Sequence, residues 1–157
     1  RWNHDARGAF VGLSVTSGKG DITRAVLEGV GFNLKIILDI LEKGAASGGI
    51  NEVIMIGGGA KGAVWLQILA DIWQKPLAVP AYTEEATSLG AAVCGGVGIG
   101  AFRDFSVIRD FNAPVQKISP NRNLAPVYGK LFPLFNRAYE GLCETFRGLA
   151  EFRGRAD

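Results

Sequence analysis

The sequence has little of what many catalytic sites are built from. It contains one histidine, His4, and two cysteines, Cys94 and Cys143, which lie far apart in apolar helical patterns. A lone imidazole excludes both a histidine-based zinc site and a nucleophile activated by histidine. The two cysteines are typical of small buried core residues rather than of a disulfide or a metal site. Most hydrolase classes are therefore excluded.

An excess of charge of one sign and long apolar runs are lacking too. Against 15 Asp and Glu stand 17 Lys and Arg, the formal net charge is +2, and the basic residues form no run. Nucleic acid is therefore not an expected partner. Glycine or charged residues interrupt each apolar stretch well short of the ~20 residues of a bilayer span, and no signal segment opens the sequence. We expect no membrane partner and a cytoplasmic location.

What is present is the composition of a globular protein, with 48% hydrophobic and 20% charged residues among 157. This favours one domain or a piece of one. The sequence begins with Arg1, and its one methionine, Met55, lies inside an apolar run. We therefore expect a fragment of a longer protein. Residues 45–49 and 112–123 are the segments richest in loop-forming residues.

A long amphipathic helix is predicted from about Asp21, which suits an N-cap, to a stop signal at Gly44. A short extended segment, residues 8–14, precedes it. Gly29 and Gly31 each cost roughly 1 kcal/mol against alanine inside a helix, so they indicate close approach by another backbone or a ligand. Apolar residues recur near helical spacing and predict a packed face: Ile22, Val26, Val30, Ile37 and Leu41.

Strands and helices alternate after that helix. Residues 52–56 and 77–80 have the pattern of short strands, a helix is predicted from 63 to about 73, and another over 85–97. The alternation predicts a parallel sheet covered by helices, and the second helix, rich in Ala and Gly, is expected to pack tightly on it. The first helix is expected to place one face in the core, namely Trp65, Ile68, Leu69 and Ile72.

The last third of the sequence predicts an irregular segment over 112–123 and then a long terminal helix. Pro133 is expected to kink this helix or to mark its effective start. An aromatic and apolar stripe predicts a face buried against the rest of the protein: Tyr128, Leu131, Phe132, Phe135, Tyr139, Leu142 and Phe146.

The strongest functional signal is the turn GGGAKG, residues 57–62, between a predicted strand and a predicted helix. Free backbone N–H groups and the helix dipole favour a nucleotide there, glycine allows its close approach, and Lys61 can reach an anionic group. The turn also fits the G-x-G-x-x-G pattern, with Glu84 and Glu85 near the position of a ribose-binding acid. An NAD-dependent oxidoreductase is therefore an alternative, although few strand signals follow.

Four motifs over residues 1–102 resemble, in order and spacing, the FGGY family of carbohydrate kinases, and among them the xylulokinases most. Residues 5–14 resemble the segment after the sugar-domain junction, and residues 24–32 resemble the next helix. Residues 85–92 are similar to the element that follows the second strand. Between them lie residues that resemble the adenosine motif and signature of the family: 57–61, Trp65, Gln67, Ala70 and Asp71.

The resemblance implies an α/β fold, part of a ribonuclease-H-like domain of the actin, hexokinase and heat-shock ATPase superfamily, with a parallel βαβα unit plus long helices. Residues 1–157 are then a C-terminal kinase domain fragment. Its nucleotide-binding βα elements lie in 1–111, and a loop and the terminal helix lie in 112–157. The resemblance also implies that the nucleotide lies against Gly58, Gly59, Ala60, Lys61 and Ala63.

The implied activity is transfer of the ATP γ-phosphate to a sugar hydroxyl, with D-xylulose converted to D-xylulose 5-phosphate. Magnesium (Mg) is the implied metal. The aspartate base, the phosphate loops and the Mg ligands of the family lie upstream of these motifs, so we nominate no catalytic residue and no metal ligand here. Asp71 is interpreted as a helix-packing or capping group. The expected role of the carboxylates in general is solvated or capping: Asp5, Asp21, Glu28, Asp71, Glu84 and Glu85.

The implied partners are ATP, a sugar substrate and the missing N-terminal kinase portion, and a homodimer is also expected. A second alternative, besides the oxidoreductase, is a free-standing nucleotide-binding module without catalysis. An initiator methionine in the gene would favour that module.

Overall fold

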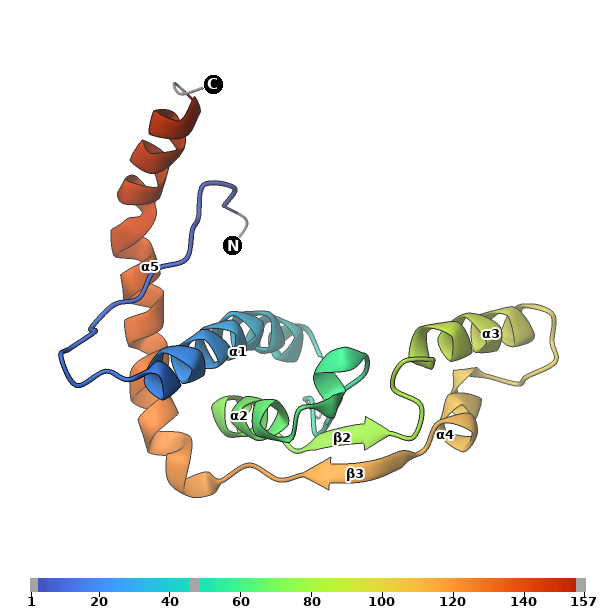
Figure 1. Ribbon diagram of the computed structural model, residues 1–157. Helices are drawn as coiled ribbons and strands as arrows, with labels where there is room; N and C mark the ends of the chain where they lie inside the picture. Colours follow the sequence, from blue (N-terminus) through green and yellow to red (C-terminus); the bar gives the residue numbers. More distant parts are fainter. Residues whose placement is uncertain (1–2, 46–48, 155–157) are drawn as a thin grey trace.

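The computed structural model describes residues 3–45 and 49–154 (Figure 1). Residues 46–48 of the predicted loop and the last three of the predicted terminal segment therefore lie outside the described residues. Within the described part, α and β elements alternate from α1 to β2 and long helices flank them. No helix in that part of the chain has the length and apolar character needed to cross a bilayer.

A small mixed sheet lies at the centre of the described chain. Its strands are β1 (Val53–Ile54), β2 (Leu77–Pro80) and β3 (Pro114–Ile118), in the order β1-β2-β3. The parallel pairing of β1 with β2 confirms the prediction, although β1 is shorter than residues 52–56. All four residues of β2 are buried.

The prediction of an irregular segment over 112–123 is wrong for β3, which pairs antiparallel to β2 with Leu77 opposite Ile118. Pro114 and the polar pair Gln116 and Lys117 hide the strand signal, because only Ile118 in β3 is buried. The backbone of β3 is ordered by pairing with β2, and short sequence windows carry no information about that contact.

Helix α1 (Lys19–Gly44) begins two residues before Asp21. Gly18 is its N-cap, so the prediction for Asp21 is wrong: its carboxylate accepts the Gly18 N–H, at 2.9 Å, from within the first turn. The predicted packed face is not the face that is buried within the described residues. Gly31, Phe32 and Leu38 are buried, whereas the stripe formed by Ile22, Val26, Val30, Ile37 and Leu41 is 37% to 58% exposed.

Close approach is confirmed at Gly31, but the side chains of Ile72 and Trp73 make it, rather than another backbone or a ligand as predicted. The Gly31 carbonyl oxygen accepts a hydrogen bond from the indole Nε1 of Trp73 at 3.0 Å, and a Cβ at this position would lie 2.7 Å from Cδ1 of Ile72. At Gly29 the prediction is wrong within the described residues, because an added Cβ there meets no atom within 4 Å.

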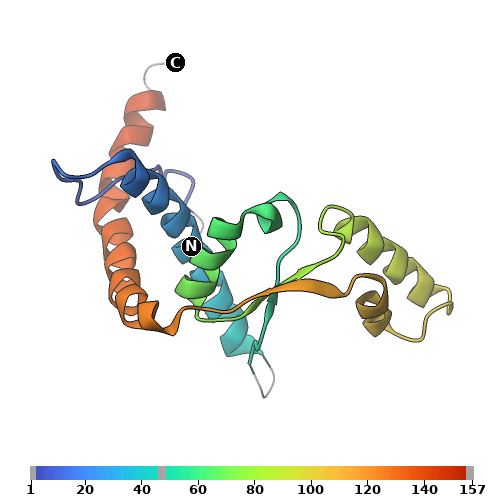
Figure 2. The ribbon, with the colours of Figure 1, turned by 60° about the horizontal axis from the view of Figure 1, so that its bottom comes forward.

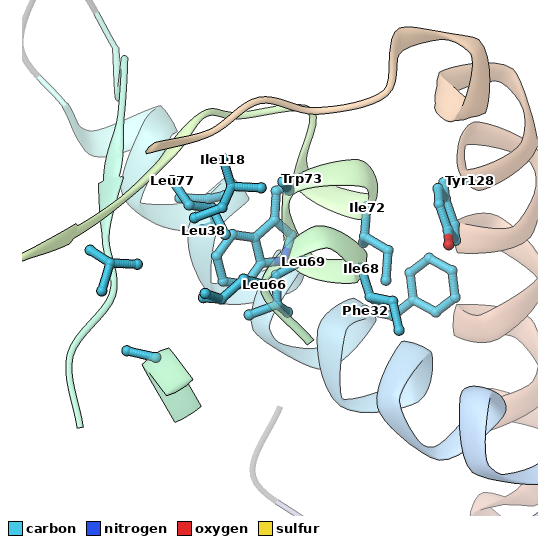
Figure 3. Close-up of a cluster of buried hydrophobic side chains, with 13 residues drawn as sticks. Phe32, Leu38, Leu66, Ile68, Leu69, Ile72, Trp73, Leu77, Ile118 and Tyr128 are labelled. Atoms are coloured by element: carbon cyan, nitrogen blue, oxygen red, sulfur yellow. The ribbon is translucent and has the colours of Figure 1, made fainter. Parts of the chain in front are cut away.

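The core forms where α1, α2 (Ala63–Trp73) and the sheet meet, and Figure 3 shows its side chains. The bounds of α2 and β2 agree with the predicted ones. Leu66, Leu69 and Leu77 are completely enclosed. Burying a side chain of this size stabilises the fold by about 1.5–3 kcal/mol. Trp65 is half-buried against this core.

Helix α5 (Ala125–Gly154) packs its first turns on α1. The ring of Phe32 lies 5.4 to 6.0 Å, centroid to centroid, from those of three α5 residues, Tyr128, Phe132 and Phe135. The aromatic face is therefore confirmed for this part of the stripe, while Leu131 is exposed. Pro133 lies inside the helix and does not mark its start.

Helices α3 (Ala86–Gly98) and α4 (Ile108–Phe111) lie side by side and form an arm that extends away from α1, α2 and α5 (Figures 1 and 2). The prediction that α3 packs tightly on the sheet is therefore wrong: its buried residue is Val93, and the ring of Phe102 covers Gly96. Cys94 is exposed and Cys143 half-buried, both as free thiols, so the prediction of buried cysteines is also wrong.

Candidate functional site

The turn between β1 and α2 has a fixed backbone shape. Gly57 has φ 75° and ψ −170°, a conformation that is essentially restricted to glycine. Its N–H donates to the Thr83 carbonyl oxygen at 2.8 Å, and its own carbonyl oxygen accepts the Ala60 N–H at 3.0 Å. The 3-10 turn η1 (Gly58–Lys61) follows and leads into α2. The family resemblance points to Gly58 and Gly59, yet the position that requires glycine is Gly57.

The five residues expected to contact a nucleotide lie together in this turn, but not in the same way. Gly58, Gly59, Lys61 and Ala63 are exposed, whereas Ala60 is only 4% exposed and belongs to the core cluster. Ala60 therefore anchors the turn, and little of this residue is left for a ligand to contact.

Trp65 forms part of the support for the turn. A Cβ on Gly59 would lie 3.4 Å from the indole Nε1 of Trp65, and a Cβ on Gly62 would lie 3.3 Å from its Cβ. The predicted core role of Trp65 is confirmed in that it packs on the buried cluster. The same side chain also backs the glycines against which a ligand would lie.

The charge at the turn is paired. The Lys61 ammonium forms an ion pair with the carboxylate of Glu84, which follows β2, and both side chains are more than 60% exposed. This hydrogen-bonded pairing raises the pKa of Lys61 and lowers the pKa of Glu84. Both groups are therefore charged at neutral pH, and an anionic ligand that engages Lys61 has to compete with Glu84. Sequence reasoning considered both residues but not their contact.

Asp71 and Gln67, two polar residues of the signature, have a structural role. Asp71 is 4% exposed. Its Oδ1 accepts the Gln67 side-chain amide at 2.8 Å and the Asn121 backbone N–H at 2.7 Å. These bonds fasten α2 to the segment that enters α5. The interpretation of Asp71 as a helix-packing or capping group is therefore confirmed.

Glu28, expected to be solvated or capping, instead links α1 to α5. Glu28 accepts hydrogen bonds from Arg24 Nε and from the Tyr128 hydroxyl, each at 2.8 Å. No group of three or more His, Cys, Asp or Glu within the described residues could hold a metal ion.

A glycine turn that joins a parallel strand to a helix, with a lysine beside it, is typical of nucleotide-binding α/β proteins. The model of the FGGY family of carbohydrate kinases, C-terminal domain, matches residues 1–99. The chain belongs to this family. Its mixed α/β fold is part of the actin/hexokinase-like ATPase fold of the FGGY kinases. This assignment replaces the oxidoreductase alternative.

Among curated relatives, a gluconokinase from Bacillus licheniformis is 32% identical over 152 residues, which cover 97% of this chain and 29% of that protein. A xylulose kinase from Staphylococcus xylosus is 33% identical over 135 residues, or 85% of this chain and 27% of that protein. The chain thus spans under a third of the length of these relatives.

Solved structures show the same likeness. The ligand-bound xylulose kinase from Lactobacillus acidophilus superposes with a TM-score of 0.84 and 29% identity, covering 94% of this chain and 30% of that one. The glycerol kinase from Plasmodium falciparum, solved with ADP, superposes with a TM-score of 0.71 and 28% identity, covering 88% of this chain and 27% of that one.

Proposed function

We propose that this chain is the ATP-binding part of a longer carbohydrate kinase, which transfers the γ-phosphate of ATP to a sugar hydroxyl. The observation that carries the proposal is the glycine turn of residues 57–62, exposed and backed by Trp65, in a chain of the FGGY family. A related glycerol kinase was solved with ADP, which supports an adenine nucleotide as the ligand. Residues 1–111 are proposed to carry the nucleotide site, and 112–157 to complete the domain.

At the turn, each residue has a distinct proposed task. Gly58 and Gly59 let the adenosine approach the backbone, Ala60 anchors the turn in the core, and Ala63 borders the ligand at the start of α2. Lys61, released in part from Glu84, offers a positive charge to the nucleotide. Binding here relies on shape and contact more than on charge, because the ammonium is already paired and exposed.

Phosphoryl transfer depends on positioning and on stabilising charge at the γ-phosphate. Mg supplies much of that charge when bound, and we assign its ligands and the aspartate base to chain outside the described residues. The part of this chain in the reaction is therefore to hold and orient ATP. The cytoplasm, where ATP is abundant, is the proposed location.

The remainder of the kinase is also the proposed partner for surfaces left open here. The α1 stripe is exposed, and β1, at the edge of the sheet, pairs only with β2 among the described strands. Apolar stripes and free strand edges attract partners. The relatives are more than three times as long as this chain. We therefore favour further kinase chain as the cover of these surfaces over the alternative of a free-standing module.

D-Xylulose is the proposed sugar, and D-gluconate is the second candidate. The resemblance of the motifs favours xylulose, and a xylulose kinase structure superposes with a TM-score of 0.84. The gluconokinase match supports gluconate, because it extends over 97% of the chain at a similar identity. A coupled assay of ADP release by the complete protein, with each sugar in turn, distinguishes the two. If the protein phosphorylates D-gluconate but not D-xylulose, D-gluconate replaces D-xylulose as the proposed substrate.

The nucleotide site is tested by Gly59→Val in the complete protein. The φ of Gly59 is not positive, so its backbone accepts a side chain, but an added Cβ lies 3.4 Å from the indole Nε1 of Trp65. The branched valine therefore presses on this support and displaces the turn that is proposed to receive the ligand. We expect ATP binding, measured by calorimetry, to weaken roughly tenfold or more. Lys61→Ala should weaken it by about threefold or less, because an exposed lysine contributes little.

The matched control is Gly148→Val, which makes the same change at an open position of α5. It should leave the dissociation constant of ATP unchanged. If Gly59→Val folds and binds ATP as tightly as the unmodified protein, the site assignment is wrong.

A further inference from the structure

Two connections join the α3–α4 arm to the sheet, one between β2 and α3 and one between α4 and β3. The side chain of Asn112 links these two connections. The Asn112 Oδ1 accepts the Tyr82 N–H at 2.8 Å, and the Asn112 Nδ2 donates to the Tyr82 carbonyl oxygen at 2.9 Å. Next to it, the Ala81 N–H donates to the Ala113 carbonyl oxygen at 3.1 Å. The amide of Asn112 thus satisfies both backbone groups of Tyr82, as a neighbouring strand would.

This side-chain bridge lies just beyond a weak point of the backbone ladder. Pro80 of β2 lies opposite Pro114 of β3, and the register shifts between Val79 and Pro80. Proline has no N–H to donate, so a ladder weakens where two prolines face each other. Asn112 continues the pairing beyond this gap and fixes the chain that leaves β2.

The segment held by Asn112 contacts the glycine turn through the two residues that follow Tyr82. The residue after Tyr82 is Thr83, whose carbonyl oxygen accepts the Gly57 N–H at 2.8 Å. The residue after that is Glu84, the partner of Lys61. The Gly57 hydrogen bond and the Lys61 ion pair therefore depend on where residues 82–84 lie.

We propose that Asn112 is a positioning residue for the nucleotide site: through residues 82–84 it holds Gly57 and Lys61 in the geometry that receives ATP. The nucleotide part of this inference rests on the proposed function. Asn112 lies 55 positions after Gly57 in the sequence, outside each motif of the family resemblance, and acts without touching the ligand.

Removing the Asn112 side-chain amide should have a local effect, because water can take over its hydrogen bonds to Tyr82. Tyr82 is exposed and Asn112 is half-buried, so losing the bridge releases residues 82–84 without burying an unpaired group. Loosening this segment disturbs the turn and leaves the core around Leu69 intact. A residue that only stabilised the fold would change overall unfolding instead.

The experiment compares Asn112→Ala and Asn112→Asp with the unmodified complete protein. The aspartate keeps the size and the acceptor, but it replaces the donor to the Tyr82 carbonyl with a repelling oxygen, so it separates the bridge from packing. Asn123, exposed beyond the other end of β3, provides the matched controls Asn123→Ala and Asn123→Asp. The readouts are amide exchange of the peptide that contains Gly57, and KM and kcat with ATP varied.

For both Asn112 variants we expect faster exchange at the turn and a KM for ATP raised about threefold to tenfold, with kcat within about twofold. The Asn123 variants should match the unmodified protein in both readouts. If either folded Asn112 variant keeps the exchange rate and the KM unchanged while the unmodified protein binds ATP, the inference about Asn112 is wrong and the proposed function still stands. If the unmodified protein binds no ATP, the proposed function is overturned together with it.

Discussion

Gly57 shows how one residue sets the shape of the candidate site. It has φ 75° and ψ −170°, and its N–H donates to the Thr83 carbonyl oxygen. Residues other than glycine are strained in this region because their Cβ meets the neighbouring backbone. Gly58, next to it, has no positive φ and open space around its Cα.

These neighbouring glycines allow a paired test at the residue scale. Gly57→Ala should lower the stability of the complete protein by about 1–3 kcal/mol, because alanine has to adopt a strained conformation. Gly58→Ala should change it by less than about 0.5 kcal/mol. Urea unfolding without nucleotide measures both, and equal midpoints for the two variants would contradict the role given to Gly57.

The ion pair of Lys61 and Glu84 gives the turn a charge state that depends on pH. The pKa of Glu84 is lowered, so its contribution is present above the ordinary glutamate range and is lost as pH falls through the lowered value. The pKa of Lys61 is raised, so its contribution is present below the ordinary lysine range and is lost as pH rises through the raised value. Across the neutral range the pair is intact.

At the scale of elements, the contact between α1 and α2 depends on a glycine. Gly31 brings the α1 backbone against Ile72 and lets its carbonyl oxygen accept from Trp73. A Cβ added to Gly29, on the same helix, would meet no atom within 4 Å among the described residues. One helix thus carries two glycines of different structural value.

Alanine at each position separates helix propensity from packing. Gly29→Ala should stabilise the protein by up to about 1 kcal/mol, since alanine favours helix. Gly31→Ala gains the same propensity but forces its Cβ to within 2.7 Å of buried Ile72, an overpacking that costs about 1–3 kcal/mol. We expect Gly31→Ala to have the lower thermal unfolding temperature of the two. The reverse order would contradict the close packing of α1 on α2.

At the scale of the whole molecule, the described chain combines a core with open surfaces. The buried cluster joins α1, α2, α5 and the sheet, whereas the α1 stripe, the β1 edge and the α3–α4 arm face outward. The arm contacts little but itself (Figure 2). On the proposed function, this chain by itself is not a complete kinase, because positioning ATP does not alone transfer a phosphoryl group.

The isolated chain should therefore be inactive and self-associated. We expect no turnover with ATP and D-xylulose or D-gluconate, since transition-state stabilisation has to come from chain outside this part. The α1 stripe and the β1 edge should pair between copies and give dimers or larger species in sedimentation velocity. A stable monomer that phosphorylates either sugar would contradict both halves of this expectation.

Local signals in the sequence determined the elements that depend on local physics. The bounds of α2 and β2, the parallel pairing of β1 with β2 and the place of the glycine turn follow from periodicity, β-branched runs and glycine chemistry. The family motifs extend this to membership of the FGGY family. All of these are properties of short windows of chain.

Tertiary structure decided whatever depends on partners distant in sequence. Pairing with β2 orders β3 despite Pro114. The positions of α2 and α5 decide which side of α1 is buried. Helical periodicity predicts that a helix has an apolar face, but not which element packs against it. The pairing of Lys61 with Glu84 and the bridge from Asn112 to Tyr82 arise in the same way. A contact between residues far apart exists only once the chain has brought them together, so the sequence specified the turn and the fold arranged what supports it.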